Sequence, residues 1–295
     1  MAEKITAQMV KSLREQTGAG MMECKKALQE AQGDMDQASE IIQKAGHKKA
    51  AKKADRTAAE GIIVCKISDD KKFGVMIEIN SETDFVARDE NFKAFSEQLI
   101  NLALSKKAKN LDELLALNLS DNQTVEQARQ ALIAKIGENV NIRRIECVDG
   151  DEGLVEAYLH GTKIGVLVHM VAGNETLAKD IAMHVAAMRP ICVNSDEVPS
   201  DLIEREKRIA KERALESGKP EQIVDKIVEG QVQKFLNEMC LMGQNFVKDQ
   251  NSTVKKVLKE NQAEVTTFIR YEVGEGIEVQ KMSFQEEVMS TARGK

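Results

Sequence analysis

The side chains that most often carry catalysis or bind metals are few and scattered in this chain. The sequence holds four histidines and five cysteines, with no C-x-x-C pair and no histidine beside a serine or cysteine in a known nucleophile motif. Neither of the common nucleotide-binding signatures, G-x-x-x-x-G-K-S/T and G-x-G-x-x-G, occurs. The sequence therefore argues against an enzyme and predicts neither a metal site nor a bound cofactor.

The histidines differ in what their positions suggest. His169 is expected within a strand and His184 within a helix, where structural roles are favoured. The alternative is an enzyme that uses His160 or His184 together with a metal or a small substrate. His160 falls in a predicted turn, so it is the histidine that we expect to contact a partner.

Recognition rather than catalysis is the chemistry suggested by residues 81–88, which read SETDFVAR. An acidic residue, Asp84, directly precedes a large aromatic residue, Phe85, ahead of an amphipathic helix expected from about Asp89. Loops held on a rigid scaffold carry much of protein recognition. The alternative is a core role, because Phe85 lies seven residues before Phe92 and would share its buried face if the helix began earlier.

Composition bounds the class of protein that must hold this segment. The chain has 295 residues, a net charge of −6, no tryptophan and only 3% aromatic residues. That length allows two or more domains, and the abundance of Ala, Leu, Lys, Glu and Met favours helices over strands. The charge offers no general attraction to nucleic acid. Scattered cysteines, no apolar signal region and no membrane-spanning stretch lead us to expect a cytoplasmic protein with reduced thiols and no membrane partner.

The first 46 residues predict three short helices, separated by glycines at 18–20 and at Gly33, with Asp34 as an N-cap. So small a bundle is expected to dock on the rest of the chain or to bind something through a surface patch. The candidates for that patch are Arg14, Met21, Met22, Lys25 and Lys26. Methionines at helical spacing are, however, more often core residues.

A basic stretch follows, with six lysines and arginines between residues 44 and 56. It suits either a solvated, partly helical linker or a patch for nucleic acid or an acidic partner. No aromatic residues are interleaved for base stacking, so the linker is favoured and no stable nucleic-acid partner is expected.

The middle of the chain is similar to itself. An E-G start, a strand, a turn, a second strand and a helix run from residue 60 to about 102, and the same order recurs from 152 to 188. In the first copy a helix follows from Thr124, where Thr124-x-x-Gln127 is a capping-box pattern. The second copy has VAGNE at 171–175 in place of the 81–88 segment. The fold can therefore spare Asp84 and Phe85, which shifts our interpretation of them toward function.

Pro190 and Pro199 bracket a break in the core pattern, after which a charged helical hairpin is expected as an insertion into the second copy. From 196 to 229, 17 of 34 residues are charged, and a turn is expected at 217–220. Helices with such narrow apolar stripes usually pair with each other or with another subunit. A strong strand pattern at 263–273 then returns to the core, and a helix over 284–291 is expected to end the chain. The predicted fold class is α+β.

Several motifs together resemble the bacterial elongation factor Ts family over essentially the full length of the chain. They are LREQTGAGMMECKKAL at 13–28, TDFVA at 83–87, KIGEN at 135–139, His160-Gly161 and FIRYEVGEG at 268–276. The resemblance implies a guanine-nucleotide exchange factor that promotes GDP release from elongation factor Tu, a translational GTPase. An exchange factor need bind no nucleotide itself, which agrees with the missing phosphate motifs.

The resemblance also implies roles for individual residues. In the TDFV motif of Thr83, Asp84, Phe85 and Val86, the Asp-Phe pair would insert into the GTPase domain and disturb its magnesium and phosphate-binding loop. The other implied contact residues are Arg14, Met21, Met22 and Lys25 in the bundle, together with Ile136, Gly137 and His160.

The same resemblance, together with the internal repeat, implies a domain organisation for the chain. The expected parts are 1–56, a three-helix bundle resembling ubiquitin-associated (UBA) domains with its basic linker; 57–150, the first core subdomain; 151–192 with 230–276, the second; 193–229, an inserted coiled-coil hairpin for homodimerisation; and 277–295, a C-terminal module.

Overall fold

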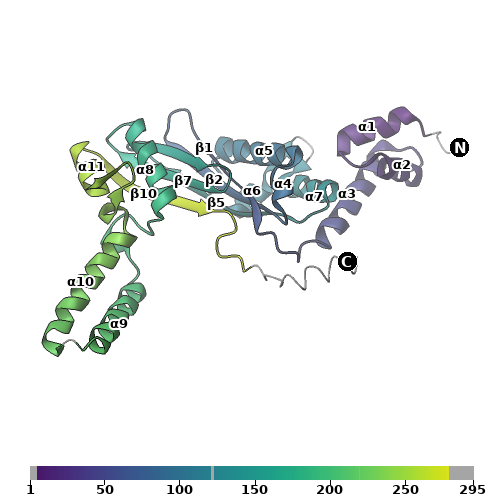
Figure 1. The fold of residues 1–295 in the computed structure, drawn as a ribbon. Helices are drawn as coiled ribbons and strands as arrows, with labels where there is room; N and C mark the ends of the chain where they lie inside the picture. Colours follow the sequence, from purple (N-terminus) through teal and green to yellow (C-terminus); the bar gives the residue numbers. More distant parts are fainter. Residues whose placement is uncertain (1–4, 121–122, 219, 279–295) are drawn as a thin grey trace.

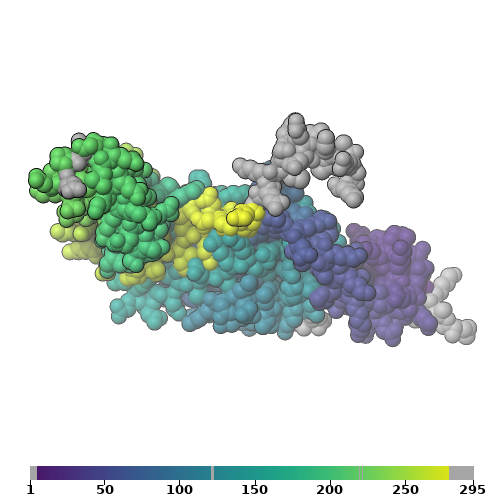
Figure 2. All heavy atoms as spheres, turned by 90° about the horizontal axis from the view of Figure 1, so that it is seen from below, coloured from purple at the N-terminus to yellow at the C-terminus, as the bar shows by residue number. Residues whose placement is uncertain are grey.

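Helices and strands are mixed in an α+β structure, as predicted (Figure 1). The computed structural model describes residues 5–120, 123–218 and 220–278. Three N-terminal helices, a core of two sheets and a helical hairpin follow one another along an elongated molecule. Figure 2 shows the same row from below, with the hairpin at one end and the N-terminal helices at the other.

The N-terminal bundle consists of α1 (Ala7–Thr17), α2 (Met21–Glu30) and α3 (Met35–Ala51). Thr6 caps the first helix and Asp34 caps the third. The fully buried side chains of Leu13, Cys24 and Leu28 form the centre of a small apolar core between the helices. The helix α3 is longer than expected and contacts α7 (Val125–Ile136). The first half of the basic stretch is therefore part of a packed helix rather than of a solvated linker.

The first sheet has the antiparallel order β1-β2-β5, formed by β1 (Glu60–Ile67), β2 (Phe73–Ser81) and β5 (Val140–Asp149). Every residue of the central strand β2 is buried, because one face packs against α5 (Glu90–Lys106) and the other faces the second sheet. An unbroken apolar run such as 73–77 is what a strand covered on both faces requires.

Four short elements, none of which was predicted from the sequence, complete this half. They are α4 (Asp84–Ala87), α6 (Leu111–Ala116), β3 (Asn118–Ser120) and β4 (Gln123–Thr124). The capping box expected at the start of α7 is present, since Thr124 and Gln127 exchange side chain to backbone hydrogen bonds.

The second sheet repeats this plan with the order β10-β7-β6. Its strands are β6 (Leu154–His160), β7 (Ile164–Val171) and β10 (Glu264–Glu272), and α8 (Glu175–Met188) and α11 (Val254–Glu260) cover its outer face. The two sheets pack face to face where glycines allow close approach. A Cβ on Gly165 would lie 2.5 Å from Ile63 Cγ2, and one on Gly74 would lie 2.7 Å from Val155 Cγ1.

The helical hairpin consists of α9 (Ser200–Glu216) and α10 (Glu221–Met239), which contact each other and project from the body (Figure 1). Their contact buries Ala210, Ala214 and Val224. The boundary expected between 229 and 230 lies inside α10, because the helix continues without a break to the core. The remaining elements are η1 (Ser195–Glu197), η2 (Leu241–Gly243), β8 (Asn245–Phe246) and β9 (Asp249–Thr253).

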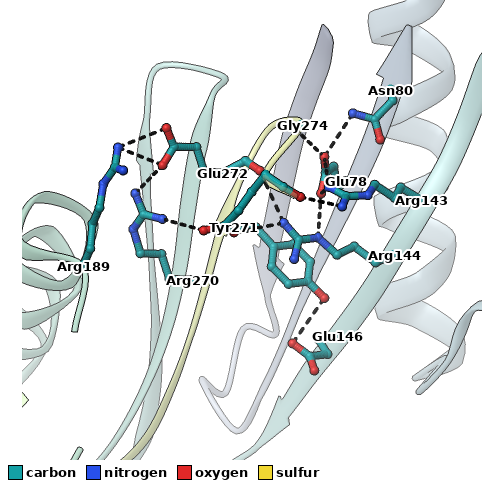
Figure 3. Close-up of polar contacts among 11 residues, drawn as sticks. Glu78, Asn80, Arg143, Arg144, Glu146, Arg189, Arg270, Tyr271, Glu272 and Gly274 are labelled. Atoms are coloured by element: carbon teal, nitrogen blue, oxygen red, sulfur yellow. Dashed lines mark hydrogen bonds and ion pairs between the residues drawn. The ribbon is translucent and has the colours of Figure 1, made fainter. Parts of the chain in front are cut away.

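A buried carboxylate joins the last strand to the first sheet (Figure 3). Glu78 on β2 is fully buried and accepts hydrogen bonds from Arg143, Arg144, Asn80 and the backbone N–H of Gly274. The turn after β10, within the FIRYEVGEG motif, is thus held against β2. The motif has a structural role at the joint between the sheets.

Two further observations concern the described ranges only. None of their helices combines the length and apolar character needed to cross a membrane. No group of three metal-ligating side chains gathers within them. The helix expected at 284–291, and with it most of the expected module 277–295, lies outside the described residues.

Candidate functional site

The Asp-Phe pair lies on a helical turn of its own. After β2 ends at Ser81, the four-residue helix α4 begins at Asp84, with Thr83 as its N-cap, and α5 starts separately with Asp89 as N-cap. The Phe85 side chain is 79% exposed. The core alternative for Phe85 is therefore wrong, and Asp84 does not cap the following helix.

The two halves of α4 face opposite environments. Asp84 pairs with Arg88 at 2.8 Å on the exposed side. Val86 and Ala87 are buried in the core of the first sheet. The prediction that Val86 contacts a partner stays a prediction. In the folded chain its buried side chain anchors the turn that presents Phe85.

The end of α7 lies beside this turn. Ile136 is half-buried, and Gly137 ends the helix with a left-handed φ of 89°, a conformation that suits glycine. The next residue, Glu138, accepts hydrogen bonds from the backbone N–H and the hydroxyl of Thr83. The structure thus brings Ile136 and Gly137 next to the Asp84-Phe85 turn, from 50 residues further along the chain.

His160 is the last residue of β6 and is exposed, with its Nδ1 3.3 Å from the hydroxyl of Tyr158. The turn that follows it contacts β1, where Ile63 N–H donates to the Thr162 carbonyl and Lys163 pairs with Glu60. Glu60 lies opposite Ser81 in the sheet register. The His160 turn is therefore packed against the edge from which α4 emerges.

The N-terminal candidates form a separate surface. Arg14 and Lys25 are exposed, and Met21 and Met22 are 50% and 65% exposed. The expectation that these methionines are core residues is wrong, since the buried face of α2 is made by smaller side chains and one leucine. The bundle is tied to the site through the end of α3, where the Lys53 ammonium donates to the Gly137 carbonyl.

Two carboxylates at this site were missed in the sequence. Glu82 accepts from the backbone N–H of Asn139 at 2.6 Å, and Glu138 accepts from Thr83 at 3.0 Å. Glu138 stands in the KIGEN motif and Glu82 in the 81–88 segment, so both lay within sequences already singled out, but neither pattern indicated that they bind each other's neighbours. No spacing rule connects residues more than 50 positions apart.

The buried histidine His184 has a structural environment. Burial lowers its pKa, and a hydrogen bond with Gln244 only partly opposes this. Its Nδ1 accepts from Val247 N–H at 3.1 Å, so Nε2 carries the proton that is shared with the Gln244 carbonyl at 3.0 Å. Both nitrogens are occupied within the core, which leaves no free base for catalysis.

Comparison with known proteins decides the family. A family model described as Elongation factor TS matches residues 82–275. The elongation factor Ts of Legionella pneumophila (strain Lens) is 54% identical over 289 residues, covering 98% of this chain and 99% of that protein. The chain belongs to the elongation factor Ts family. The elongation factors Ts of Alkalilimnicola ehrlichii and Yersinia pestis (strain Pestoides F) are each 52% identical, over 98% of this chain and 99% and 98% of theirs.

Elongation factor Ts relatives of full length therefore cover the N-terminal bundle as well, although the family model begins at Glu82. The model starts one residue before the TDFV motif and ends within the motif at 268–276. Its bounds enclose β5 of the first sheet, the whole second sheet, the hairpin, Ile136, Gly137 and His160, whereas β1 and β2 precede them. The arrangement offers a rigid scaffold that presents one exposed aromatic ring beside one acidic side chain, which is suited to entering a pocket on another protein.

Proposed function

We propose that this chain is a guanine-nucleotide exchange factor that promotes GDP release from elongation factor Tu during translation elongation. Membership of the elongation factor Ts family supports the partner and the process. The observation that carries the mechanism is the exposure of Phe85 on a helical turn whose other side is buried in the core. In the proposal, Asp84 and Phe85 insert into the GTPase domain and disturb its magnesium and phosphate-binding loop.

The physical basis is thermodynamic linkage. A protein that binds the GTPase more tightly when nucleotide or metal is absent must weaken nucleotide binding by the same factor. Each 1.4 kcal/mol of such coupling weakens the nucleotide about tenfold. A desolvated aromatic anchor is the kind of side chain that contributes about 2 kcal/mol or more to an interface. Phe85 exposes its ring in the free protein, so this burial is still to be gained on binding.

The remaining contacts of the proposal extend along the molecule. Ile136 and Gly137 would contact the GTPase beside the Asp84-Phe85 turn, and His160 would extend this surface along the neighbouring sheet edge. The bundle would contribute a second contact through Arg14, Met21, Met22 and Lys25. All of these except the half-buried Ile136 and Gly137 are exposed.

Domain roles complete the proposal. The bundle of 1–56 would be UBA-like, and the hairpin at 193–229 a coiled coil that mediates homodimerisation. The core subdomains would be 57–150 and 151–192 with 230–276, and 277–295 a C-terminal module. In this proposal the protein is cytoplasmic, because its partner GTPase acts there in translation. It is not an enzyme, because it acts by binding and not by making or breaking bonds. The exposed Leu215 and Ile223 near the hairpin's turn support an intermolecular role for it.

The test is release of fluorescent GDP from elongation factor Tu with catalytic amounts of this protein. Truncating Phe85 to alanine should lower the exchange efficiency by about 30-fold, which corresponds to about 2 kcal/mol. Asp84→Ala should give a smaller loss, because its carboxylate is already paired with Arg88. Met188→Ala removes another exposed apolar side chain and serves as the control. Unchanged release with the Asp84/Phe85 double variant would refute the assignment of this turn.

A further inference from the structure

Two glutamates hold the α4 turn against the loop after α7 in a reciprocal arrangement. Glu138 accepts from the backbone N–H of Thr83 at 3.0 Å, and Glu82 accepts from the backbone N–H of Asn139 at 2.6 Å. Each carboxylate thus binds the residue that follows the other. The Thr83 hydroxyl adds bonds of 2.8 and 3.1 Å to the two oxygens of Glu138. We call these four residues the clasp.

The clasp replaces the usual support of a helix start. Thr83 is the N-cap of α4, but its side chain makes no capping bond within that helix. Its hydroxyl donates to Glu138 instead. A helix of four residues cannot hold itself by its own backbone bonds. Its orientation depends on the buried Val86 and Ala87 on one side and, at the N-cap Thr83, on bonds from the Ser81 hydroxyl and to Glu138.

A second layer keeps the far side of the clasp in place. The side-chain amide of Asn139 donates to the backbone carbonyl of Arg56 at 2.8 Å and to that of Ala54 at 3.3 Å. Arg56 also pairs with Glu82 at 3.4 Å. The chain that leaves the N-terminal bundle is thereby fastened to two of the four clasp residues, so three separate segments meet at the clasp.

We propose that Glu138 is a positioning residue for nucleotide exchange, acting by holding α4 so that Phe85 points away from the core before the GTPase arrives. This rests on the function proposed above. Phe85 lies two residues after Thr83. If Thr83 were not held by Glu138, the Phe85 ring would take many directions. A protein whose binding-competent state is only partly populated has its apparent affinity reduced by that fraction.

The expected kinetic effect is selective. Glu138→Ala removes a carboxylate that accepts from two donors, the backbone N–H and the hydroxyl of Thr83. A hydrogen bond to a charged group contributes about 1.5 kcal/mol or more, so the population of molecules with an ordered α4 turn should fall about tenfold. The concentration of this protein that half-saturates GDP release should rise about tenfold, while the rate at saturation stays close to normal. Glu138→Gln keeps one acceptor oxygen and should lie between the two. A Glu138→Ala change made in a Phe85→Ala background should have little further effect.

A matched control comes from Glu113, an exposed carboxylate that also accepts a backbone N–H, that of Lys109 at 2.9 Å. Glu113→Ala should leave the release curve unchanged. Circular dichroism and the urea midpoint of each variant establish that it is folded. If Glu138→Ala lowers release equally with and without Phe85, its role is merely structural and the proposal is wrong.

A second measurement does not depend on the GTPase. The chain contains no tryptophan, so Phe85→Trp creates a single fluorescent probe at the turn. Adding Glu138→Ala should lower the indole's fluorescence anisotropy and speed hydrogen exchange at the Thr83 amide about tenfold. Glu113→Ala should change neither. Unchanged anisotropy and exchange in the Glu138 variants would overturn the proposal.

The two measurements separate the inference from the function on which it rests. If the unaltered protein fails to speed GDP release, the proposed function fails, and the anisotropy alone decides whether Glu138 orders the turn. If release is normal in the unaltered protein and the turn loosens in Glu138→Ala without any change in half-saturation, the clasp does not serve exchange and the inference is refuted.

Discussion

Replacing Glu78 with glutamine tests how the last strand is joined to the first sheet. The Glu78 carboxylate is fully buried and accepts from Arg144 Nε at 2.6 Å, from Gly274 N at 2.8 Å and from Arg143 Nη1 at 3.0 Å. Figure 3 shows these donors converging on it from β5 and from the turn after β10. Glutamine has the same size, but it loses the charge and turns an amide donor toward a guanidinium.

The magnitude follows from what remains after the change. Removing one partner of a buried ion pair typically costs about 3 to 5 kcal/mol. The side chains of Arg143 and Arg144 retain 24% and 30% of their exposure, so water can partly replace the lost charge. We therefore expect Glu78→Gln to lower the free energy of unfolding by about 3 kcal/mol at pH 7, near the low end of that range.

The loss of stability in Glu78→Gln should also depend on pH. Burial alone would raise the pKa of Glu78, but hydrogen bonds from Gly274, Asn80 and Arg144, with the charge of Arg144, lower it below the ordinary value of 4.5. A carboxylate with a lowered folded-state pKa contributes its full stability above the unfolded value and loses it as the pH falls through the folded value. The difference between the unaltered protein and Glu78→Gln should therefore narrow below pH 4.5.

Urea unfolding followed by circular dichroism, at several pH values from 7 to about 3, measures both quantities. Glu146→Gln is the control, because Glu146 lies on the same sheet but is exposed and, among the described residues, accepts from the Tyr271 hydroxyl alone, at 3.2 Å. It should change stability by less than about 0.5 kcal/mol. A loss of that small size in Glu78→Gln, or a larger loss that does not shrink in acid, would refute the reasoning.

Three further predictions concern the core and its helices. The free energy of unfolding should fall as the pH drops below the ordinary histidine pKa of 6.5, because the pKa of folded His184 is lowered and its Nδ1 must stay neutral to accept from Val247 N–H. Thermal unfolding of His184→Gln should therefore depend less on pH. Gly165→Ala should lower the free energy of unfolding by about 2 kcal/mol in urea, because its Cβ would lie 2.5 Å from a side-chain carbon of β1. Asp89→Ala should cost about 1 kcal/mol in the same assay, because two backbone N–H groups at the start of α5 lose their acceptor.

Local signals made much of the fold predictable. Asp34 and Thr124 were predicted as helix starts, and both cap helices in the structure. Each is decided by a side chain that bonds to backbone two or three residues away, so the sequence alone contains both partners. The apolar run that became β2 was equally readable, because a strand buried on both faces needs no polar alternation.

The direction of individual side chains on short helices was not predictable. Phe85 and Val86 are adjacent and both apolar, yet one is exposed and the other buried. Met21 and Met22 are exposed although their spacing is that of core residues. A helix of one or two turns carries too few residues for its periodicity to show which face meets the core, so packing against neighbouring elements decides it.

The sequence by itself determined the mixed α+β class, most helix and strand positions and, through its motifs, the family. Only the tertiary structure decided that Glu138 meets Thr83 and that Glu82 meets Asn139, because these pairs are 55 and 57 residues apart. Local rules act over a few residues, whereas bonds such as these exist only once the residues after α7 lie beside those that follow β2. The turn that presents Phe85 has as its N-cap Thr83, which is bound to Glu138 from a distant segment, so its direction is a property of the whole folded core.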